Sequence, residues 1–439
     1  MSLLGMLRYG IGCVGGRAML RLERLGLERR MRAPGFWKSE HLSSPLAVSP
    51  RLKELISRHY LDGRFAQGAR KVAWVTSGAP VEVLVALGYL TIYPENHGAV
   101  CGIRRTAEEL CETAEDAGYS RDICSYARTD FGCVLSGKTP VGRLPPPDIL
   151  VCCTNICQTV LHWYQVLAHH FDVPLVLIDT PFLYGDAPAH AVDFVERQLD
   201  ASVPVMERVA GKELSDARLR EVTRCSRQAC ELWLKVIESG TARPAPITAF
   251  DQFIHLAPIV EMRGRGFTVD YYAALLREIE ERKAAGVGAL KNERKRVVWD
   301  NLPIWYRVRW MGDLLAERGV AMVTSTYTNA WGELAEMIDP QRPMQSAARV
   351  YLHPILNRGT GHKLATMQRM VRDYSADGVL LHSDRSCKPY SIGQISQRDR
   401  LAAAGVPALL LEADHNDPRA FSEEQARSRI EAFLEMMGA

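Results

Sequence analysis

The 439-residue sequence lacks several features that mark common functional classes. No apolar run reaches the roughly 18 residues that a membrane-spanning helix needs. The formal net charge of +3 is too small to argue for a nucleic-acid partner. The string RGTGHK at 358–363 lacks the full spacing of a phosphate-binding loop, and no dinucleotide-binding fingerprint follows a predicted strand. We therefore expect no membrane span, no bound nucleic acid and no nucleotide hydrolysis by this chain.

The eleven cysteines do not form the pattern of a disulfide-bonded secreted domain, because their number is odd and their spacing irregular. A cytoplasmic protein with reduced thiols is therefore expected. Three cysteines stand where a helix or loop begins, namely Cys124, Cys157 and Cys387. No two of them form a CxxC pair, which argues against a zinc ribbon or a ferredoxin-type run.

Apolar runs alternate with helical patterns in two parts of the sequence. The first part contains KVAWVTSG, PPDILVCCTN and VPLVLID, and the second contains KRVVWD, VAMVTS, GVLLHS and VPALLLEAD. Strands that are apolar on both faces and alternate with helices predict a parallel sheet covered on both sides. We therefore predict an α/β fold with two open parallel-sheet units, doubly wound in the flavodoxin or Rossmann manner and bridged by a helical segment.

The chain is longer than the usual size of one hydrophobic core, so several domains are expected. The patterns predict an N-terminal helical extension at 1–65, a first α/β domain at 66–186, a helical segment at 187–290 and a second α/β domain at 291–439. In the first domain, TIYPENHG indicates a short strand followed by a turn. In the N-terminal extension, leucines alternate with six arginines in RAMLRLERLGLERRMR. A solvated or partner-docking helix and a membrane-surface or targeting helix are both compatible with this stretch.

The three cysteines have positions suited to binding a ligand. Open parallel sheets bind ligands at the carboxyl ends of their strands. Cys157 follows the predicted strand ILVCC, Cys387 follows GVLLHS, and Cys124 follows Ser120, the expected N-cap of its helix. A helix N-terminus is expected to lower the pKa of a nearby thiol. Three such thiolates can hold an iron–sulfur cluster with one iron left open, although lone cysteines are more often small buried apolar residues. Cys101 and Cys153 are the alternative ligands.

Two further residues stand near the ends of the first two predicted strands. Ser77 follows KVAWVT, and Glu95 follows TIYP. A carboxyl group in a largely apolar pocket has a raised pKa and can serve as an acid or base. A hydrogen-bonded turn residue is the equally acceptable interpretation of Glu95.

Several long strings resemble the 2-hydroxyacyl-CoA dehydratase / benzoyl-CoA reductase family. They are YPENHGA, AEDAGYSRDICSYAR, PPDILVCCTNICQTVLHWYQVLAHHFDVPLVLIDTPF, ARPAPITAFD and HSDRSCKPYS. The resemblance runs from about Lys71 to the C-terminus and is strongest to the larger subunit of a dehydratase such as 2-hydroxyglutaryl-CoA dehydratase. The arginine-rich stretch before Pro34 lies outside it.

The resemblance implies a cofactor, partners and a reaction. Cys124, Cys157 and Cys387 match the family's ligands to a [4Fe-4S] cluster that has one iron not held by cysteine. The family forms heterodimers with a homologous second subunit, receives an electron from a separate ATP-hydrolysing iron–sulfur activator, and acts on CoA thioesters. In a dehydratase, a ketyl radical expels the α-hydroxyl group and yields a 2-enoyl-CoA. Glu95 then becomes the candidate acid or base, and Ser77 a hydrogen-bonding residue for the substrate.

Three other functions remain compatible with the sequence. The first is a subunit of an ATP-dependent benzoyl-CoA reductase, which would use the same arrangement of cluster ligands. The second is a non-catalytic electron-relay subunit whose cluster never meets substrate. The third is a zinc-binding fold, which analysis of iron and sulfide would exclude.

Overall fold

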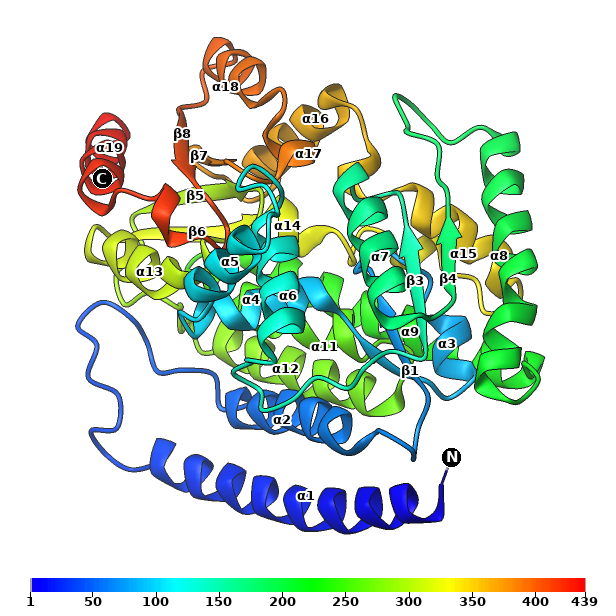
Figure 1. Ribbon diagram of the computed structural model, residues 1–439. Coiled ribbons are helices and arrows are strands. Elements are labelled where there is room, and N and C mark those ends of the chain that lie inside the picture. The colour runs from blue at the N-terminus through cyan, green and yellow to red at the C-terminus, as the bar shows by residue number, and fades with distance from the viewer. Residues whose placement is uncertain (1, 439) are drawn as a thin grey trace.

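Two parallel four-stranded sheets, each with helices packed on its faces, form the centre of the protein (Figure 1). The computed structural model describes residues 2–438. The first sheet has the order β2-β1-β3-β4 and consists of β1 (Val72–Val75), β2 (Leu90–Ile92), β3 (Ile149–Cys153) and β4 (Leu175–Ile178). The second has the order β6-β5-β7-β8 and consists of β5 (Lys295–Asp300), β6 (Val320–Ser325), β7 (Gly378–Asp384) and β8 (Ala408–Ala413). All neighbouring strands are parallel, which confirms the predicted α/β fold with two parallel-sheet units.

Helices precede, connect and follow the strands. The first sheet is accompanied by α3 (Glu82–Ala86), α4 (Pro94–Ile103), α5 (Ala107–Asp116), α6 (Ser125–Ser136) and α7 (Gln158–Phe171). Between the sheets the chain forms α8 (Ala189–Ala210), α9 (Asp216–Glu238), η1 (Ser239–Thr241), α10 (Ala249–His255), α11 (Ala257–Glu261) and α12 (Gly266–Ala284). The second sheet is accompanied by η2 (Trp305–Arg307), α13 (Val308–Glu317), α14 (Thr326–Asn329), η3 (Ala335–Met337), α15 (Pro343–Leu352), η4 (Ile355–Asn357), α16 (Thr360–Asp373), α17 (Lys388–Ser391), α18 (Gln394–Ala403), η5 (Pro418–Ala420) and α19 (Glu423–Met436).

The inner strand β1 shows why both sheet faces are covered. All four of its residues are buried. Because successive side chains of a strand point to opposite faces, Ala73 and Val75 join one apolar cluster while Val72 and Trp74 join the other. Burial on both faces therefore explains why this strand is a continuous apolar run in the sequence.

The strand order reverses at β1 in the first sheet and at β5 in the second. β1 lies between β2 and β3, and β5 lies between β6 and β7. At such a point the connections leave toward opposite faces of the sheet and open a crevice at the carboxyl ends of the strands. Each unit therefore contributes one natural ligand-binding edge.

Two local predictions are wrong. The turn predicted after the strand in TIYPENHG is the helix α4, which begins at Pro94; proline is well suited to the first helical turn because its nitrogen has no hydrogen to bond. Ser120 is not the N-cap of the following helix, because its hydroxyl accepts a bond from the Asp122 N–H in a local turn. The N-cap of α6 is Cys124 itself.

The N-terminal extension consists of two long helices, α1 (Leu3–Met31) and α2 (Ser49–Phe65). Figure 1 shows α1 along the outside of the molecule, with α2 lying between α1 and the rest of the fold. Two ionic contacts hold the two helices together: Arg17 Nη2 donates to both carboxylate oxygens of Asp62, and Arg24 Nε donates to Glu54. Within residues 2–438, no helix combines the length and apolar character that crossing a membrane requires.

Candidate functional site

All five residues singled out from the sequence line one cavity of about 140 Å³. These residues are Ser77, Glu95, Cys124, Cys157 and Cys387. The remaining wall is largely apolar and aromatic and includes Tyr126, Trp163, Tyr327, Trp331 and Tyr390. Residues following β1, β2, β3, β5, β6 and β7 contribute to the wall, so the cavity lies at the carboxyl ends of both sheets.

Each of the three cavity cysteines is the N-cap residue of a helix. Cys124 precedes α6, Cys157 precedes α7, and Cys387 precedes the short helix α17. All three are half-buried, in contrast to the other cysteines, which are buried. Besides burial, the charge of the Cys124 thiolate raises the pKa of Cys157, and the charges of Cys124 and Cys157 raise the pKa of Cys387. The fold thus brings together three thiols that are far apart in the sequence.

The predicted lowering of the thiol pKa values is wrong for Cys157 and Cys387. Burial raises the pKa of Cys157 to about 12, although the backbone N–H groups of Thr159 and Val160 at the start of α7 lower it. Burial likewise raises the pKa of Cys387 well above its usual value. The helix N-terminus acts in the expected direction but is outweighed by loss of solvent. A positively charged metal centre is the kind of partner that would deprotonate such thiols.

The spacing of the three thiols distinguishes between kinds of metal centre. Their Sγ atoms do not all lie within 4.8 Å of one another. A single tetrahedral zinc ion, with Zn–S bonds of about 2.3 Å, would hold its sulfurs within about 4 Å. The three thiols are soft donors of the kind that iron–sulfur clusters use, and they are spaced more widely than a single zinc ion requires.

A buried carboxylate organises the loop that carries Cys387. Asp384 at the end of β7 accepts hydrogen bonds from the backbone N–H groups of Ser386 (3.1 Å) and Cys387 (3.2 Å). Its second oxygen lies 2.7 Å from His415 Nδ1. Burial opposes a charge on Asp384, but the adjacent His415 ring holds the pKa of this carboxyl below its usual value. One side chain therefore fixes the Cys387 loop and orients the His415 ring.

The His415 ring extends this network to the loop that carries Cys124. Nε2 lies 2.9 Å from Ser125 Oγ and 3.9 Å from Cys124 Sγ. Burial disfavours a charged ring, but the adjacent Asp384 and Asp414 raise the pKa of His415 well above its usual value. Two cysteine loops from different α/β units are thus tied together by one buried Asp–His pair.

Arg128 ties the helix that follows Cys124 to the second unit. Its side chain is only 2% exposed and donates to Glu115 on α5 (2.6 Å) and to Asp417 beyond β8 (2.8 Å). A buried arginine bonded to two carboxylates is held firmly, because moving it would leave charges unpaired. The N-terminus of α6 is therefore fixed relative to the loop that follows β8.

Glu95 lies in the first turn of α4 and is buried. Oε1 accepts a hydrogen bond from the Ser77 N–H at 3.1 Å, whereas Oε2 is buried and has no hydrogen-bond partner among residues 2–438. Burial raises the pKa of Glu95 to about 7, although backbone N–H groups of Glu95 and Ser77 lower it. A carboxyl with this pKa exchanges protons near neutral pH. The Ser77 hydroxyl also lines the cavity, 3.4 Å from Asn96 Oδ1.

The sequence did not single out Asp384 and His415. A weak signal was present, because each stands in a polar string, HSD and EADHND, directly after an apolar strand. The two alternative cluster ligands, Cys101 and Cys153, do not line the cavity. Cys101 instead lies near Cys133 and His97 in a separate buried group.

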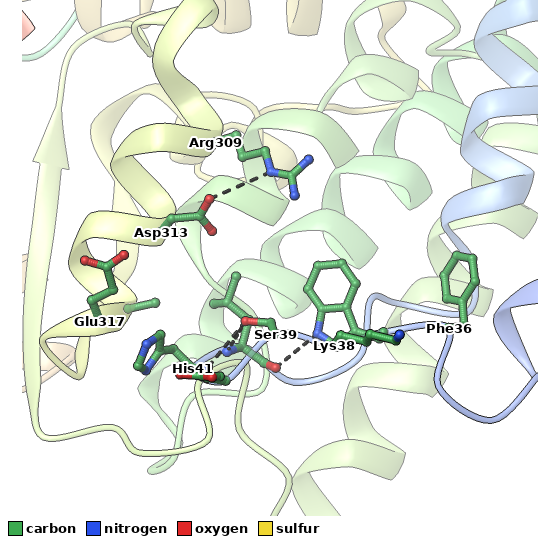
Figure 2. Close-up of a pocket in the computed structure, with 11 residues that line it drawn as sticks. Phe36, Lys38, Ser39, His41, Arg309, Asp313 and Glu317 are labelled. Atoms are coloured by element: carbon green, nitrogen blue, oxygen red, sulfur yellow. Dashed lines mark hydrogen bonds and ion pairs between the residues drawn. The ribbon is translucent and has the colours of Figure 1, made fainter.

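A larger surface hollow of about 590 Å³ lies between the segment 36–42 and α13 (Figure 2). Figure 2 shows Arg309 and Asp313, both on α13, directed toward one another on one side of the hollow. Arg309 Nε lies 3.8 Å from Asp313 Oδ2. Ser39 Oγ accepts a hydrogen bond from the Leu42 N–H. No cysteine and none of the five predicted site residues line this hollow, so it is separate from the thiol cavity.

Comparison with known proteins finds one matching family and several related chains. A family model described as "2-hydroxyglutaryl-CoA dehydratase, D-component" matches residues 76–437. The (R)-2-hydroxyisocaproyl-CoA dehydratase alpha subunit of Clostridioides difficile is 31% identical over 391 residues, covering 88% of this chain and 95% of that protein. The (R)-phenyllactyl-CoA dehydratase alpha subunit of Clostridium sporogenes is 30% identical over 372 residues, covering 84% and 90%. A benzoyl-CoA reductase subunit of Thauera aromatica is 31% identical over 402 residues, covering 88% and 93%.

Proposed function

Because the chain belongs to the family of 2-hydroxyglutaryl-CoA dehydratase D-components, we propose that it is the iron–sulfur subunit of an (R)-2-hydroxyacyl-CoA dehydratase. Such an enzyme removes water from a 2-hydroxyacyl-CoA and releases the 2-enoyl-CoA. The observation that carries the proposal is the convergence of three half-buried thiols and one buried carboxyl on a single, largely apolar cavity.

The proposed ligands of a [4Fe-4S] cluster are Cys124, Cys157 and Cys387. Their soft sulfur donors and their spacing, too wide for one zinc ion, support this choice. With three protein ligands, one iron would remain free of cysteine. Such a cluster supplies a low-potential electron and an iron that can act as a Lewis acid on a substrate oxygen.

Glu95 would remove a proton from the substrate, and Ser77 would help to orient the substrate. The β-hydrogen of a 2-hydroxyacyl thioester becomes removable only after one-electron reduction of the thioester and loss of the α-hydroxyl group. Glu95 is the proposed base, because its pKa is about 7 and its buried Oε2 has no other partner in the described chain. The Ser77 hydroxyl would donate a hydrogen bond to a substrate oxygen. The apolar wall would exclude water from the radical, and return of the electron makes the overall reaction redox-neutral.

The proposed partners are a homologous second subunit and a separate ATP-hydrolysing iron–sulfur activator. The sequence supports this division of labour, because it contains no complete phosphate-binding loop.

A benzoyl-CoA reductase subunit is the second candidate. It is favoured by the 31% identity with the Thauera aromatica reductase subunit. In that reaction the electrons would remain in the product, and ATP would be consumed with every turnover.

We expect the anaerobic complex of this chain, its second subunit and the activator to convert a 2-hydroxyacyl-CoA into the enoyl-CoA with catalytic ATP. Benzoyl-CoA should remain unchanged under the same conditions, and product analysis by mass spectrometry distinguishes the two. Formation of a dienoyl-CoA with stoichiometric ATP would overturn the dehydratase proposal. A colourless preparation that contains zinc but no iron or sulfide would overturn both candidates.

Replacement of Asp384 by asparagine should weaken retention of the cluster. An Asp384→Asn side chain has one accepting oxygen and one donating amide group, so it loses the charge that pairs with His415 and can bond to Nδ1 only if that nitrogen gives up its proton. Loss of an outer partner of this kind typically costs about 10- to 100-fold in metal affinity. The measurement is the rate of iron release to a chelator under anaerobic conditions. Asp300→Asn is the matched control, because Asp300 is also a buried acid at the end of a strand but bonds to Thr326 and Gln394 instead. Equal release rates for both variants would contradict the expectation.

A further inference from the structure

The outward face of α1 carries an apolar stripe that nothing in residues 2–438 covers. The stripe consists of Leu4, Leu7, Ile11, Val14, Leu22 and Leu25, whose exposed fractions run from 46% for Leu25 to 75% for Ile11. At 1.5 Å per residue it is about 32 Å long. Soluble monomers rarely expose apolar surface of this extent, so the stripe indicates a binding partner.

The opposite face of α1 is fixed on α2, so the helix cannot turn the stripe inward. A Cβ atom at Gly12 would come within 2.7 Å of the Phe65 ring, which shows how closely the two helices approach. Cys13 is buried on the same side, and the Arg17 guanidinium is bonded to both oxygens of Asp62. Figure 1 likewise shows α1 at the edge of the molecule.

The spacing of the stripe is that of a helix-pairing seam. Its members, together with the exposed Ala18, are separated by 3, 4, 3, 4, 4 and 3 residues. On an α-helix they fall within about 80° of the circumference. Three further exposed apolar side chains, Leu3, Met6 and Met19, flank this stripe on α1. The alternation of 3 and 4 residues within the stripe is typical of two helices that pack side by side.

The stripe is complementary to itself when reversed. In an antiparallel pair, Leu4 meets Leu25 of the second helix, Leu7 meets Leu22, and Ile11 meets Ala18, because the two residue numbers of each pair sum to 29. Val14 then lies beside the two-fold axis. A patch that pairs with an identical copy of itself about a two-fold axis is the requirement for a symmetric dimer.

We propose that two copies of this chain pair through α1, antiparallel, about an axis near Val14. Charges permit the pairing, since Arg8 and Arg21 project on opposite sides of the stripe and do not meet across it. Gly15 lies next to the axis and has open space around it, so a second helix can approach closely there. The interface uses residues before the segment 76–437 that matches the family model, and it is independent of the proposed reaction.

The mass of the full-length chain in solution tests the proposal. Sedimentation of the anaerobically purified chain at micromolar concentration should give about twice its 49.0 kDa. The double variant Leu7→Glu, Leu22→Glu should raise the dimer Kd at least about tenfold, because burying even one leucine is worth that much. Met19→Glu is the matched control, since Met19 is exposed on the same helix but lies off the stripe. Circular dichroism would show that every variant is folded.

Crosslinking tests the orientation. With a short bismaleimide, Val14→Cys chains should crosslink to one another, whereas Leu4→Cys chains should not. Crosslinking of both variants would indicate parallel helices and overturn the antiparallel pair. A monomeric wild type, or a dimer unchanged by Leu7→Glu, Leu22→Glu, would overturn the proposed interface. A stripe-dependent association of the wild type with anionic lipid vesicles, or with the homologous subunit alone, would assign α1 to a different partner.

Discussion

Replacement of Cys124, Cys157 or Cys387 by serine is expected to abolish stable cluster binding. The three thiols come from three separate loops and are the cysteines that line the cavity. With no spare thiol in the wall, loss of one leaves two protein ligands. The effect should exceed the roughly 100-fold upper cost of losing an outer hydrogen-bonding partner, because a bond to the metal itself is lost. Iron and sulfide content after anaerobic reconstitution, together with the visible absorption of the cluster, would measure it.

Cys225→Ser provides the control for these three variants. Cys225 is a buried cysteine on α9 that does not line the cavity, so its replacement should leave the iron content unchanged. If a single cavity variant retained the full iron content and activity, that residue would not be a ligand. Dehydration activity should fall in parallel with iron content in each cavity variant.

Glu95→Gln is expected to lower dehydration about 10²- to 10⁴-fold, the usual contribution of a positioned acid or base. The variant should keep its iron, because Glu95 is not among the proposed ligands. Ser77→Ala should have a smaller effect, since the bond that holds Glu95 comes from the Ser77 backbone N–H rather than from its hydroxyl. The measurement is turnover by the reconstituted complex, normalised to iron content. Unchanged turnover in Glu95→Gln would favour an electron-relay subunit over a catalytic one.

The pH dependence follows from the raised pKa of Glu95. A base must be ionised, so wild-type turnover should rise as the pH increases through about 7, and Glu95→Gln should remove this rise.

The free energy of unfolding should instead fall as the pH rises over this range. The folded chain binds the proton more tightly than the unfolded chain, because burial raises the pKa from 4.5 to about 7. The wild type should therefore lose at most about 3 kcal/mol relative to Glu95→Gln as the pH rises from about 4.5 to 7, which denaturant unfolding at several pH values would measure.

The sequence predicted the position of some site residues for a reason that the structure supports. Cys157, Cys387 and Ser77 follow strands, and in a parallel sheet the ends of neighbouring strands meet at one edge. Cys124 follows no strand; it was singled out because it stands at the start of a helix or loop, and the resemblance to a known family then favoured it over Cys101 and Cys153. The roles of these residues and of Glu95 remain predictions.

The thiol pKa values were not accessible from the sequence. The helix N-termini beside Cys157 and Cys387 were predicted, but their effect competes with burial, and the extent of burial depends on packing between distant segments. The pairing of Asp384 with His415 is another such case, because the two residues come from different loops 31 positions apart.

The sequence alone determined that the chain alternates apolar strands with helices, that three cysteines stand at the starts of helices, and that leucines and arginines alternate near its N-terminus. These are local properties, set by spacing along the chain and by the preferences of neighbouring residues. Only the tertiary structure decided that the two sheets share one cavity, that the thiols of Cys157 and Cys387 resist ionisation, and which face of α1 remains exposed. Each of these depends on which distant surfaces exclude water from one another, and that is established only when the two units and the N-terminal helices pack together.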